Sequence, residues 1–118
     1  MILNGSSSGI KNETTMVAAK TLECLKNNVP EEVPGIAFLS GGQSEIEATQ
    51  NLNEINKIND SNFIFTFSYG RALQQSALKK WAENIQDKQA VQAVFDQRAL
   101  MNSLAATGKW DQNKEIAA

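Results

Sequence analysis

The sequence predicts an α/β fold with parallel strands, and three observations support this class. Two short apolar runs, residues 35–40 and 63–68, have the length and the flanking turn residues of buried strands. Stretches with apolar residues at i, i+4 and i+7 precede, separate and follow these runs, which is helical periodicity. Alternating helices and strands are typical of parallel sheets, because parallel strands need a crossover connection. The chain has 118 residues, 42% hydrophobic and 20% charged, as expected for a globular protein.

A polar loop is expected over residues 1–13, followed by a helix over residues 14–27. Asn12 or Thr14 is the candidate N-cap, because either side chain can accept a hydrogen bond from a backbone N–H of the first turn. Cys24 lies beside the apolar stripe of this helix, so we expect a buried and unreactive thiol. The stripe itself consists of Ala18, Leu22 and Leu25.

The first strand is expected over residues 35–40, and its continuous apolar run predicts burial on both faces. A second helix follows from Ser44 to about Ile58. Ser44 and Glu47 stand three residues apart, which is the spacing of a capping box. The acidic residues of this region have the spacing of a solvated helix face, and they are Glu45, Glu47, Glu54 and Asp60.

The second strand is expected over residues 63–68, which are rich in phenylalanine and β-branched residues. A third helix should then run to Ala82 or Ile85. Its expected apolar face consists of Ala77, Leu78, Trp81 and Ile85.

A fourth helix is expected from Asp87 to Ala106, with Gly108 as the residue that ends it. Arg98, in the middle of this helix, is expected at the surface, solvated or in a salt bridge. Residues 109–118 are expected to form a loosely held tail. The residues expected to be buried from the fourth helix are Ala93, Leu100, Met101 and Leu104.

Composition excludes several classes of function. The 11 basic and 13 acidic side chains give a net charge of −2, which provides no basic surface for nucleic acid. No apolar run approaches the roughly 18 residues that a membrane-spanning helix needs. The absence of histidine excludes histidine-based triads and histidine-containing zinc sites, and the sequence predicts no metal site and no cofactor. Cys24 is the single cysteine and has no intramolecular partner, so a reducing, cytoplasmic setting is expected.

Two junctions, each where a strand leads into a helix, carry residues that suit anion binding. Ligands of α/β folds bind at this edge of the sheet. Glycines let the backbone approach an anion, helix N-termini offer free N–H groups, and a guanidinium matches two phosphate oxygens. A tight turn alone could also explain the glycines, and the arginine could merely pair with a carboxylate. The candidate phosphate-binding residues are Ser40, Gly41, Gly42, Ser68, Gly70 and Arg71.

Longer stretches around these junctions resemble motifs of one known family, class I fructose-bisphosphate aldolase. The stretches are VPGIAFLSGGQSE at residues 33–45, NLNEIN at residues 51–56 and FTFSYGRALQ at residues 65–74. The resemblance extends over about residues 14–110. It implies the C-terminal portion of a (β/α)8 TIM barrel: the end of strand six, then strands seven and eight with their helices.

The same resemblance implies an activity. The family reversibly cleaves fructose 1,6-bisphosphate into dihydroxyacetone phosphate and glyceraldehyde 3-phosphate through a lysine Schiff base, without a metal or cofactor. It implies a sugar bisphosphate or triose phosphate ligand for the two junctions named above, and a homo-oligomer, a tetramer, for the full-length enzyme. Neither nucleic acid nor a membrane is expected as a partner, because of the net charge and the lack of a long apolar run described above.

The beginning and end of the chain depart from the family pattern. Met1 and Ile2 are similar to the last two residues of the family's Lys-Pro-x-Met-Val motif, which would place the Schiff-base lysine before residue 1. The chain stops at Ala118 without the tyrosine that often ends the family's tail. We therefore expect a partial barrel domain over residues 1–118, divided into a loop over 1–13, barrel structure over 14–110 and a tail over 111–118.

Two consequences follow for an isolated segment of this kind. It would supply a phosphate site without the catalytic lysine and would be inactive alone. Two strands cannot close a barrel, so we expect an exposed inner face and incomplete packing of the strand phenylalanines. The alternative function is a stand-alone, non-catalytic phosphate-binding or interaction module. The phenylalanines in question are Phe38, Phe63, Phe65 and Phe67.

Overall fold

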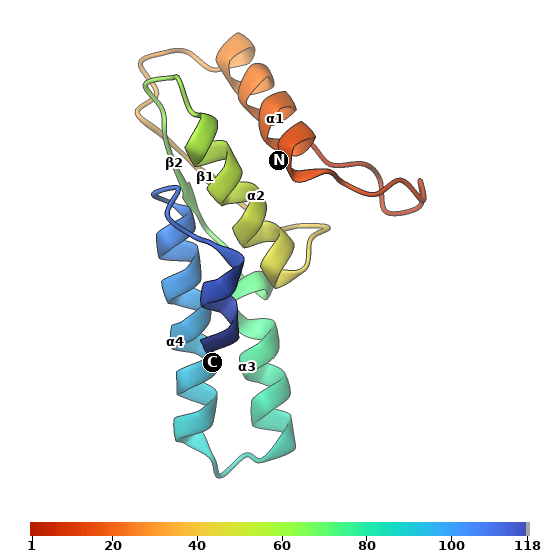
Figure 1. Ribbon diagram of the computed structural model, residues 1–118, viewed down its shortest axis with the longest axis vertical. Coiled ribbons are helices and arrows are strands. Elements are labelled where there is room, and N and C mark those ends of the chain that lie inside the picture. Colours follow the sequence, from red (N-terminus) through yellow and green to blue (C-terminus); the bar gives the residue numbers. More distant parts are fainter. Residues whose placement is uncertain (118) are drawn as a thin grey trace.

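In the computed structural model, which describes residues 1–117, helices pack on a two-stranded sheet (Figure 1). The predicted order of helices and strands is confirmed, and the one addition is a short 3-10 helix near the end. In chain order the elements are α1 (Thr14–Asn28), β1 (Gly35–Phe38), α2 (Glu45–Ile58), β2 (Ile64–Phe67), α3 (Arg71–Glu83), α4 (Lys88–Ala105) and η1 (Gln112–Ala117).

The two strands are parallel, as predicted, and Gly35 pairs with Ile64 at the start of the register. Both strands are shorter than expected. The first ends at Phe38 because a turn begins at Ser40, whose carbonyl accepts a hydrogen bond from the Gln43 N–H at 3.1 Å. One further backbone bond, from the Ser68 N–H to the Phe38 carbonyl at 2.8 Å, continues the pairing past β2.

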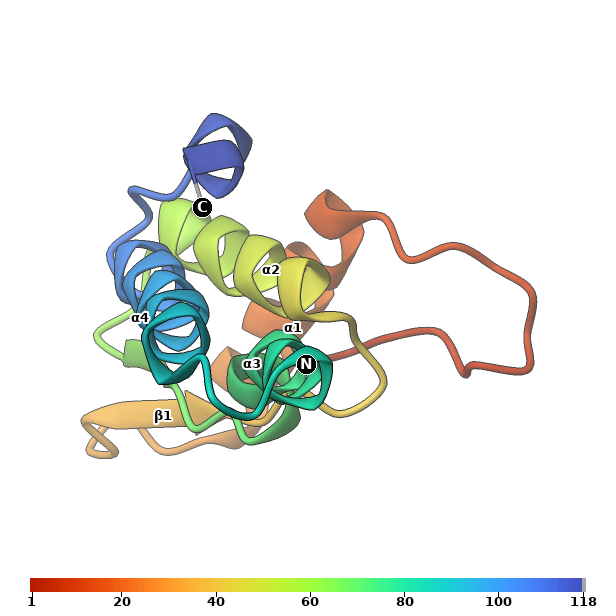
Figure 2. The ribbon, with the colours of Figure 1, turned by 90° about the horizontal axis from the view of Figure 1, so that it is seen from below.

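Only one face of the sheet is covered, so the expectation of strands buried on both faces is wrong. Phe65 is 1% exposed on the covered side, whereas its neighbour Ile64 is 70% exposed on the other side. Figure 2 shows why: α1, α2 and α4 all lie on one side of β1. The aromatic side chains point toward these helices, and the Phe38 and Phe65 rings stack with centroids 5.6 Å apart. The strand phenylalanines are therefore packed more completely than predicted: Phe38, Phe63 and Phe65 are buried and Phe67 is half-buried.

The start of α1 and the start of α2 differ in their capping. Glu13 is the N-cap of α1 and its side chain makes no capping bond, so neither predicted cap is used. The Asn12 side chain instead accepts a hydrogen bond from the Asn4 N–H at 2.6 Å. The capping box of α2 is confirmed: Ser44 Oγ accepts from the Glu47 N–H at 3.2 Å, and the Glu47 carboxylate accepts from the Ser44 N–H at 2.8 Å.

The apolar face of α1 packs on α2, whereas Cys24 of the same helix lies on its exposed side. Ala18 and Leu22 are buried as predicted, and Leu25 is partly buried against the same core. Cys24 is exposed, contrary to expectation. It follows Leu22 by two positions, which is about 200° around a helix, so it faces away from the stripe.

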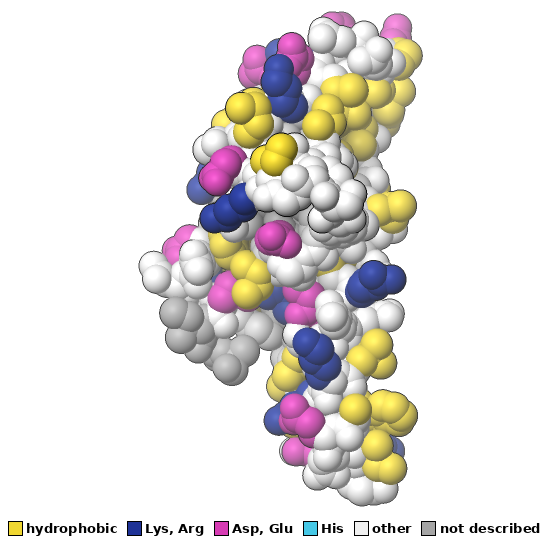
Figure 3. Space-filling view, turned by 90° about the vertical axis from the view of Figure 1, so that its right-hand side faces the viewer, with side chains coloured by type: hydrophobic (Ala, Val, Ile, Leu, Met, Phe, Trp, Pro, Cys, Tyr) yellow, Lys and Arg dark blue, Asp and Glu magenta, His cyan; other side chains and the backbone are white. Residues whose placement is uncertain are grey.

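Helices α3 and α4 form a hairpin that projects from the rest of the molecule (Figure 1). The radius of gyration is 15.3 Å, against about 13.5 Å for a compact domain of this length. Where the hairpin extends past α2 and the sheet, α3 and α4 pack against each other, and apolar side chains gather over this end (Figure 3). Burial was therefore wrongly predicted for Leu78, Trp81, Ile85, Ala93 and Leu100, which are exposed, and correctly for Ala77 and Met101.

The tail is held to the body of the molecule, so the expectation of a loose tail is wrong for residues 109–117. Gly108 has a φ of +67°, in the left-handed region, and ends α4 as predicted. Trp110 is 6% exposed, and its Nε1–H donates to the Glu115 carboxylate at 2.8 Å. The same carboxylate pairs with Arg98, which is buried at 5% exposure instead of lying at the surface.

Candidate functional site

The structure brings the six candidate residues to one shallow cleft at the carboxyl ends of the strands. The cleft has a volume of about 250 Å³. Parallel pairing places both strand ends at the same edge of the sheet, and each strand then leads into a helix. The cleft is lined by Leu39, Ser40, Gly41, Gly42, Gln43, Ser68, Gly70 and Arg71.

The first loop, residues 39–44, is held by its own backbone and by α2. The Ser40–Gln43 turn closes it, and Gly42 has a φ of +77°, which a residue with a Cβ adopts only with strain. The Gln43 side-chain oxygen accepts a hydrogen bond from Asn51 Nδ2 at 2.8 Å. Asn51 is 3% exposed, so a buried amide of α2 fixes the end of the loop. Of the two serines in the cleft, Ser40 is buried and Ser68 is exposed.

The second loop, residues 68–70, is anchored through its aromatic residue. Tyr69 is 6% exposed, and its hydroxyl donates to the Ala48 carbonyl at 2.9 Å. Burial raises the pKa of this phenol well above its ordinary value, because the charged form would lose its hydration. Tyr69 thus stays neutral and ties the second loop to α2, the helix that follows the first loop.

Two glycines of the cleft have no structural reason to be glycine within the chain. A Cβ added at Gly41 or at Gly70 would meet no atom within 4 Å, and neither residue has a positive φ. Their backbone therefore borders open space in the cleft. A ligand that approaches the backbone closely would account for both positions.

Arg71 is the cation of the cleft, and it begins α3 with an exposed side chain. A cation at a helix N-terminus is unfavourable against the helix dipole. α3 has no side-chain cap and no acidic residue in its first turn, and among residues 1–117 Arg71 makes no ion pair. An anion in the cleft would satisfy both the guanidinium and the amides at the start of α3.

One functional candidate, Glu45, could not be found from the sequence. Its spacing predicts a solvated helix face, but it is half-buried and its carboxylate accepts two hydrogen bonds from Ser76 on α3. Its spacing within α2 did not distinguish it, because its partner lies 31 residues further along the chain.

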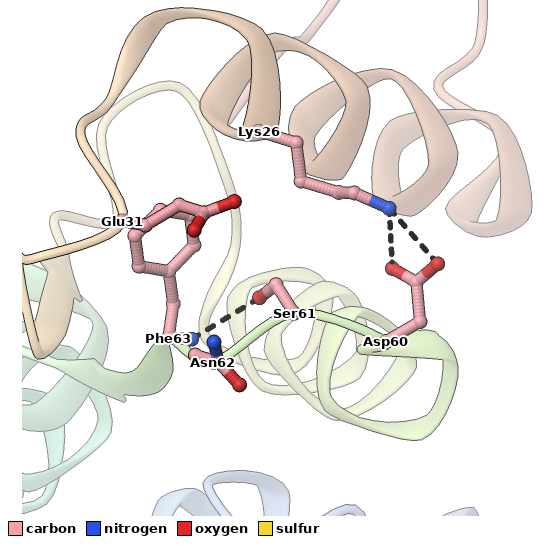
Figure 4. Close-up of a pocket in the computed structure, with 6 residues that line it drawn as sticks. All are labelled: Lys26, Glu31, Asp60, Ser61, Asn62 and Phe63. Carbon is pink, nitrogen blue, oxygen red and sulfur yellow. Dashed lines mark hydrogen bonds and ion pairs between the residues drawn. The ribbon is translucent and has the colours of Figure 1, made fainter.

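A second hollow, of about 180 Å³, lies at the opposite edge of the sheet, where residues lead into the strands (Figure 4). Lys26 donates there to both Asp60 oxygens, at 2.8 and 2.9 Å. The ammonium holds the pKa of the Asp60 carboxyl below its usual value, through the hydrogen bond first and its charge second. This contact links α1 to the turn before β2. The lining consists of Lys26, Glu31, Asp60, Ser61, Asn62 and Phe63.

Two further observations concern residues 1–117 only. No three histidine, cysteine, aspartate or glutamate residues of that range gather as a metal site would require. None of its helices combines the length and the apolar character needed to cross a bilayer.

Comparison with known proteins decides the family. The model of the family described as fructose-bisphosphate aldolase class-I matches residues 1–118. The chain belongs to the class I fructose-bisphosphate aldolase family. A solved fructose-bisphosphate aldolase from Plasmodium falciparum, determined in complex with TRAP and a small-molecule inhibitor, superimposes with a TM-score of 0.84. It is 44% identical in sequence, over 91% of this chain and 31% of that one.

Curated relatives give the same picture for this aldolase chain. A probable class 1 fructose-bisphosphate aldolase of Xanthomonas axonopodis pv. citri is 44% identical over 93% of this chain. Fructose-bisphosphate aldolase 1 of Caenorhabditis elegans is 45% identical over 100% of it. The match covers 33% of each relative, so the chain spans about a third of their length.

Proposed function

We propose that this chain is the C-terminal portion of the (β/α)8 barrel of a class I aldolase and supplies its phosphate site. In this assignment, residues before α1 follow the sixth barrel strand, β1 is the seventh strand and β2 the eighth. The exposed face of the sheet, with Ala37, Ile64 and Thr66, is then the face turned toward the barrel interior. The aromatic face packs on the outer helices, as a barrel requires.

One observation carries the phosphate assignment: two loops from neighbouring parallel strands line a single cleft that contains Arg71. Barrels of this class frequently bind phosphate with the loops after strands seven and eight. Three features would be completed by a phosphate: the glycine backbones that border open space, the uncapped start of α3, and the Arg71 guanidinium, which makes no ion pair within residues 1–117. The ligand class is a sugar bisphosphate or a triose phosphate.

The role of the cleft in the reaction would be orientation. Anchoring one phosphate uses binding energy remote from the reacting carbons to place the ketose carbonyl beside the Schiff-base lysine. The family resemblance puts that lysine before residue 1. Carbon–carbon cleavage, the homotetramer and a cytoplasmic setting belong to the full-length enzyme in this proposal.

A titration of the chain with inorganic phosphate, followed by NMR, tests the site. We expect the amide resonances of Gly41, Gly42 and Arg71 to shift along one binding curve. Arg71→Ala should weaken binding by about tenfold or more, because a charge-assisted bidentate contact is lost. Arg71→Lys keeps the positive charge but not the two parallel N–H donors of the guanidinium, so its phosphate affinity should lie between those of the wild-type chain and Arg71→Ala. Equal affinity for the wild-type chain and Arg71→Ala would contradict the assignment.

Borohydride trapping with dihydroxyacetone phosphate separates phosphate binding from catalysis. We expect no covalent adduct on this chain, because the lysine is placed outside it. An adduct would show that one of its own lysines forms the Schiff base. Phosphate binding without an adduct, in a chain that also stays inactive when joined to the remaining barrel, would favour the stand-alone binding module.

A further inference from the structure

We propose that Glu45 is a positioning residue, whose hydrogen bonds to Ser76 hold the two phosphate-binding loops at the separation that one anion requires. The inference rests on the proposed function of the cleft. It adds a residue outside the cleft lining to the machinery of that site.

The bridge connects the helices that follow the two loops. Glu45 is the first residue of α2, two positions after Gln43 of the first loop. Ser76 lies on α3, five positions after Arg71. The Ser76 N–H donates to Glu45 Oε1 at 2.9 Å, and the Ser76 hydroxyl donates to Oε2 in a shorter contact. Two bonds to one carboxylate fix its direction as well as its distance.

The backbone of Glu45 is also held from a third helix. Arg98 Nη2 donates to the Glu45 carbonyl at 3.4 Å and to Thr49 Oγ1, one turn further along α2, at 2.5 Å. The start of α2 is therefore fixed to α4 through its backbone and to α3 through its side chain. Of these two contacts, the side-chain contact is the one that reaches α3, the helix that carries Arg71.

This geometry matters because each loop supplies only part of the anion's ligands. Amides of the first loop and the guanidinium of the second can contact the same phosphate only at one relative placement. Displacement by about 1 Å weakens such multi-point contacts substantially. The Tyr69–Ala48 hydrogen bond anchors the second loop itself, whereas the Glu45–Ser76 bridge sets the position of the helix after it.

Two features of the bridge stabilise the negative charge of Glu45, although this carboxylate lies near a proposed site for an anion. Glu45 lies in the first turn of α2, where the helix dipole favours negative charge. Both of its oxygens accept from Ser76, so its charge is compensated on the α3 side. Removing Glu45 would alter charge and geometry together, whereas Ser76→Ala removes one hydrogen bond and leaves the charges of the site unchanged.

The test measures the Kd for inorganic phosphate by NMR in the chain and its variants. Ser76→Ala should raise the Kd by about three- to tenfold, as expected for one lost hydrogen bond transmitted to the site. Ser76→Thr keeps the hydroxyl and should bind within about twofold of wild type. The control is Ser103→Ala, the same substitution at an exposed position of α4, which should leave the Kd unchanged.

A second set of variants tests whether the two residues act together. Ser76→Ala removes the hydroxyl bond of the bridge, and Glu45→Gln weakens the acceptor of both bonds. Because the two changes act on the same bridge, the Kd of the double variant should rise by less than the product of the two single effects. A merely structural role would lower the urea midpoint of Ser76→Ala and leave the Kd of the folded chain unchanged. Binding within twofold of wild type by both single variants would overturn the inference while the phosphate site stands. Absence of phosphate-dependent shifts in the wild-type chain would overturn the site and this inference together.

Discussion

The buried ion pair that holds the tail gives the sharpest stability prediction. In the structure the Glu115 carboxylate pairs with Arg98, and the two side chains are 10% and 6% exposed. The Lys80–Glu83 pair on α3 provides a matched control, with side chains 45% and 65% exposed. The test compares Glu115→Gln with Glu83→Gln, the same chemical change in two different environments.

The magnitude follows from what Arg98 loses. Glutamine keeps one carbonyl acceptor for the two donors that Glu115 serves, Arg98 and Trp110 Nε1. Among the described residues, the buried Arg98 Nε atom has no hydrogen-bond partner, and the bond to Thr49 at 2.5 Å cannot replace a counter-charge. Removing one partner of a buried pair costs about 3–5 kcal/mol, and the retained acceptor reduces this to about 2–4 kcal/mol. The exposed control should cost less than about 1 kcal/mol.

Urea unfolding provides the assay. The change in tryptophan fluorescence on unfolding reports mainly on Trp110, because Trp110 is buried beside Glu115 whereas Trp81 is already 52% exposed in the folded chain. Circular dichroism reports on the helices. A domain of this size has about 5–15 kcal/mol of stability, so Glu115→Gln should lower the midpoint clearly. Arg98→Met combined with Glu115→Gln should cost less than the two single changes added together, because no charge is left unpaired. A loss below about 1 kcal/mol for Glu115→Gln, equal to that of the control, would refute the reasoning.

Two other predictions concern the cleft and its anchor. Gly42→Ala should cost about 1–2 kcal/mol of stability, because the residue at this position has a positive φ. Gly41→Ala should leave the urea midpoint nearly unchanged but weaken phosphate binding. Equal urea midpoints for the two variants would contradict this prediction. Tyr69 is the single tyrosine, so near-ultraviolet absorbance should show its phenol still protonated above pH 10 while the chain is folded. Because the folded pKa is raised, the stability from this residue is fully present below about pH 10 and is lost as the pH rises further; ionisation near pH 10 in the folded chain would be evidence against the buried phenol.

Local features of the fold could be predicted from the sequence. Ser44 and Glu47 identify a helix start because both partners of the capping box lie within one turn. Gly108 ends α4 for an equally local reason. The strand alternation is also a local feature of the sequence: Phe63, Phe65 and Phe67 alternate with polar or smaller residues, which indicates a sheet covered on one face.

Features that depend on distant partners could not be predicted in this way. Arg98 is buried because it reaches Thr49 of α2 and because the tail folds back and brings Glu115 onto α4. No spacing in the sequence pairs Arg98 with Glu115. Glu45 has the pattern of a solvated residue until α3 brings Ser76 beside it. The cleft was predictable in part. Each of the two junctions could be predicted from its own stretch of sequence, whereas their meeting in one cleft depends on the parallel pairing of β1 and β2.

The central claim, that both loops bind one phosphate, is tested most directly by a crystal structure of the chain grown with inorganic phosphate. We predict a single anion in the cleft, contacted by backbone N–H groups of Gly41 or Gly42 and by the Arg71 guanidinium. Density for phosphate at only one of the two loops, or only at the opposite edge beside Lys26, would contradict the claim.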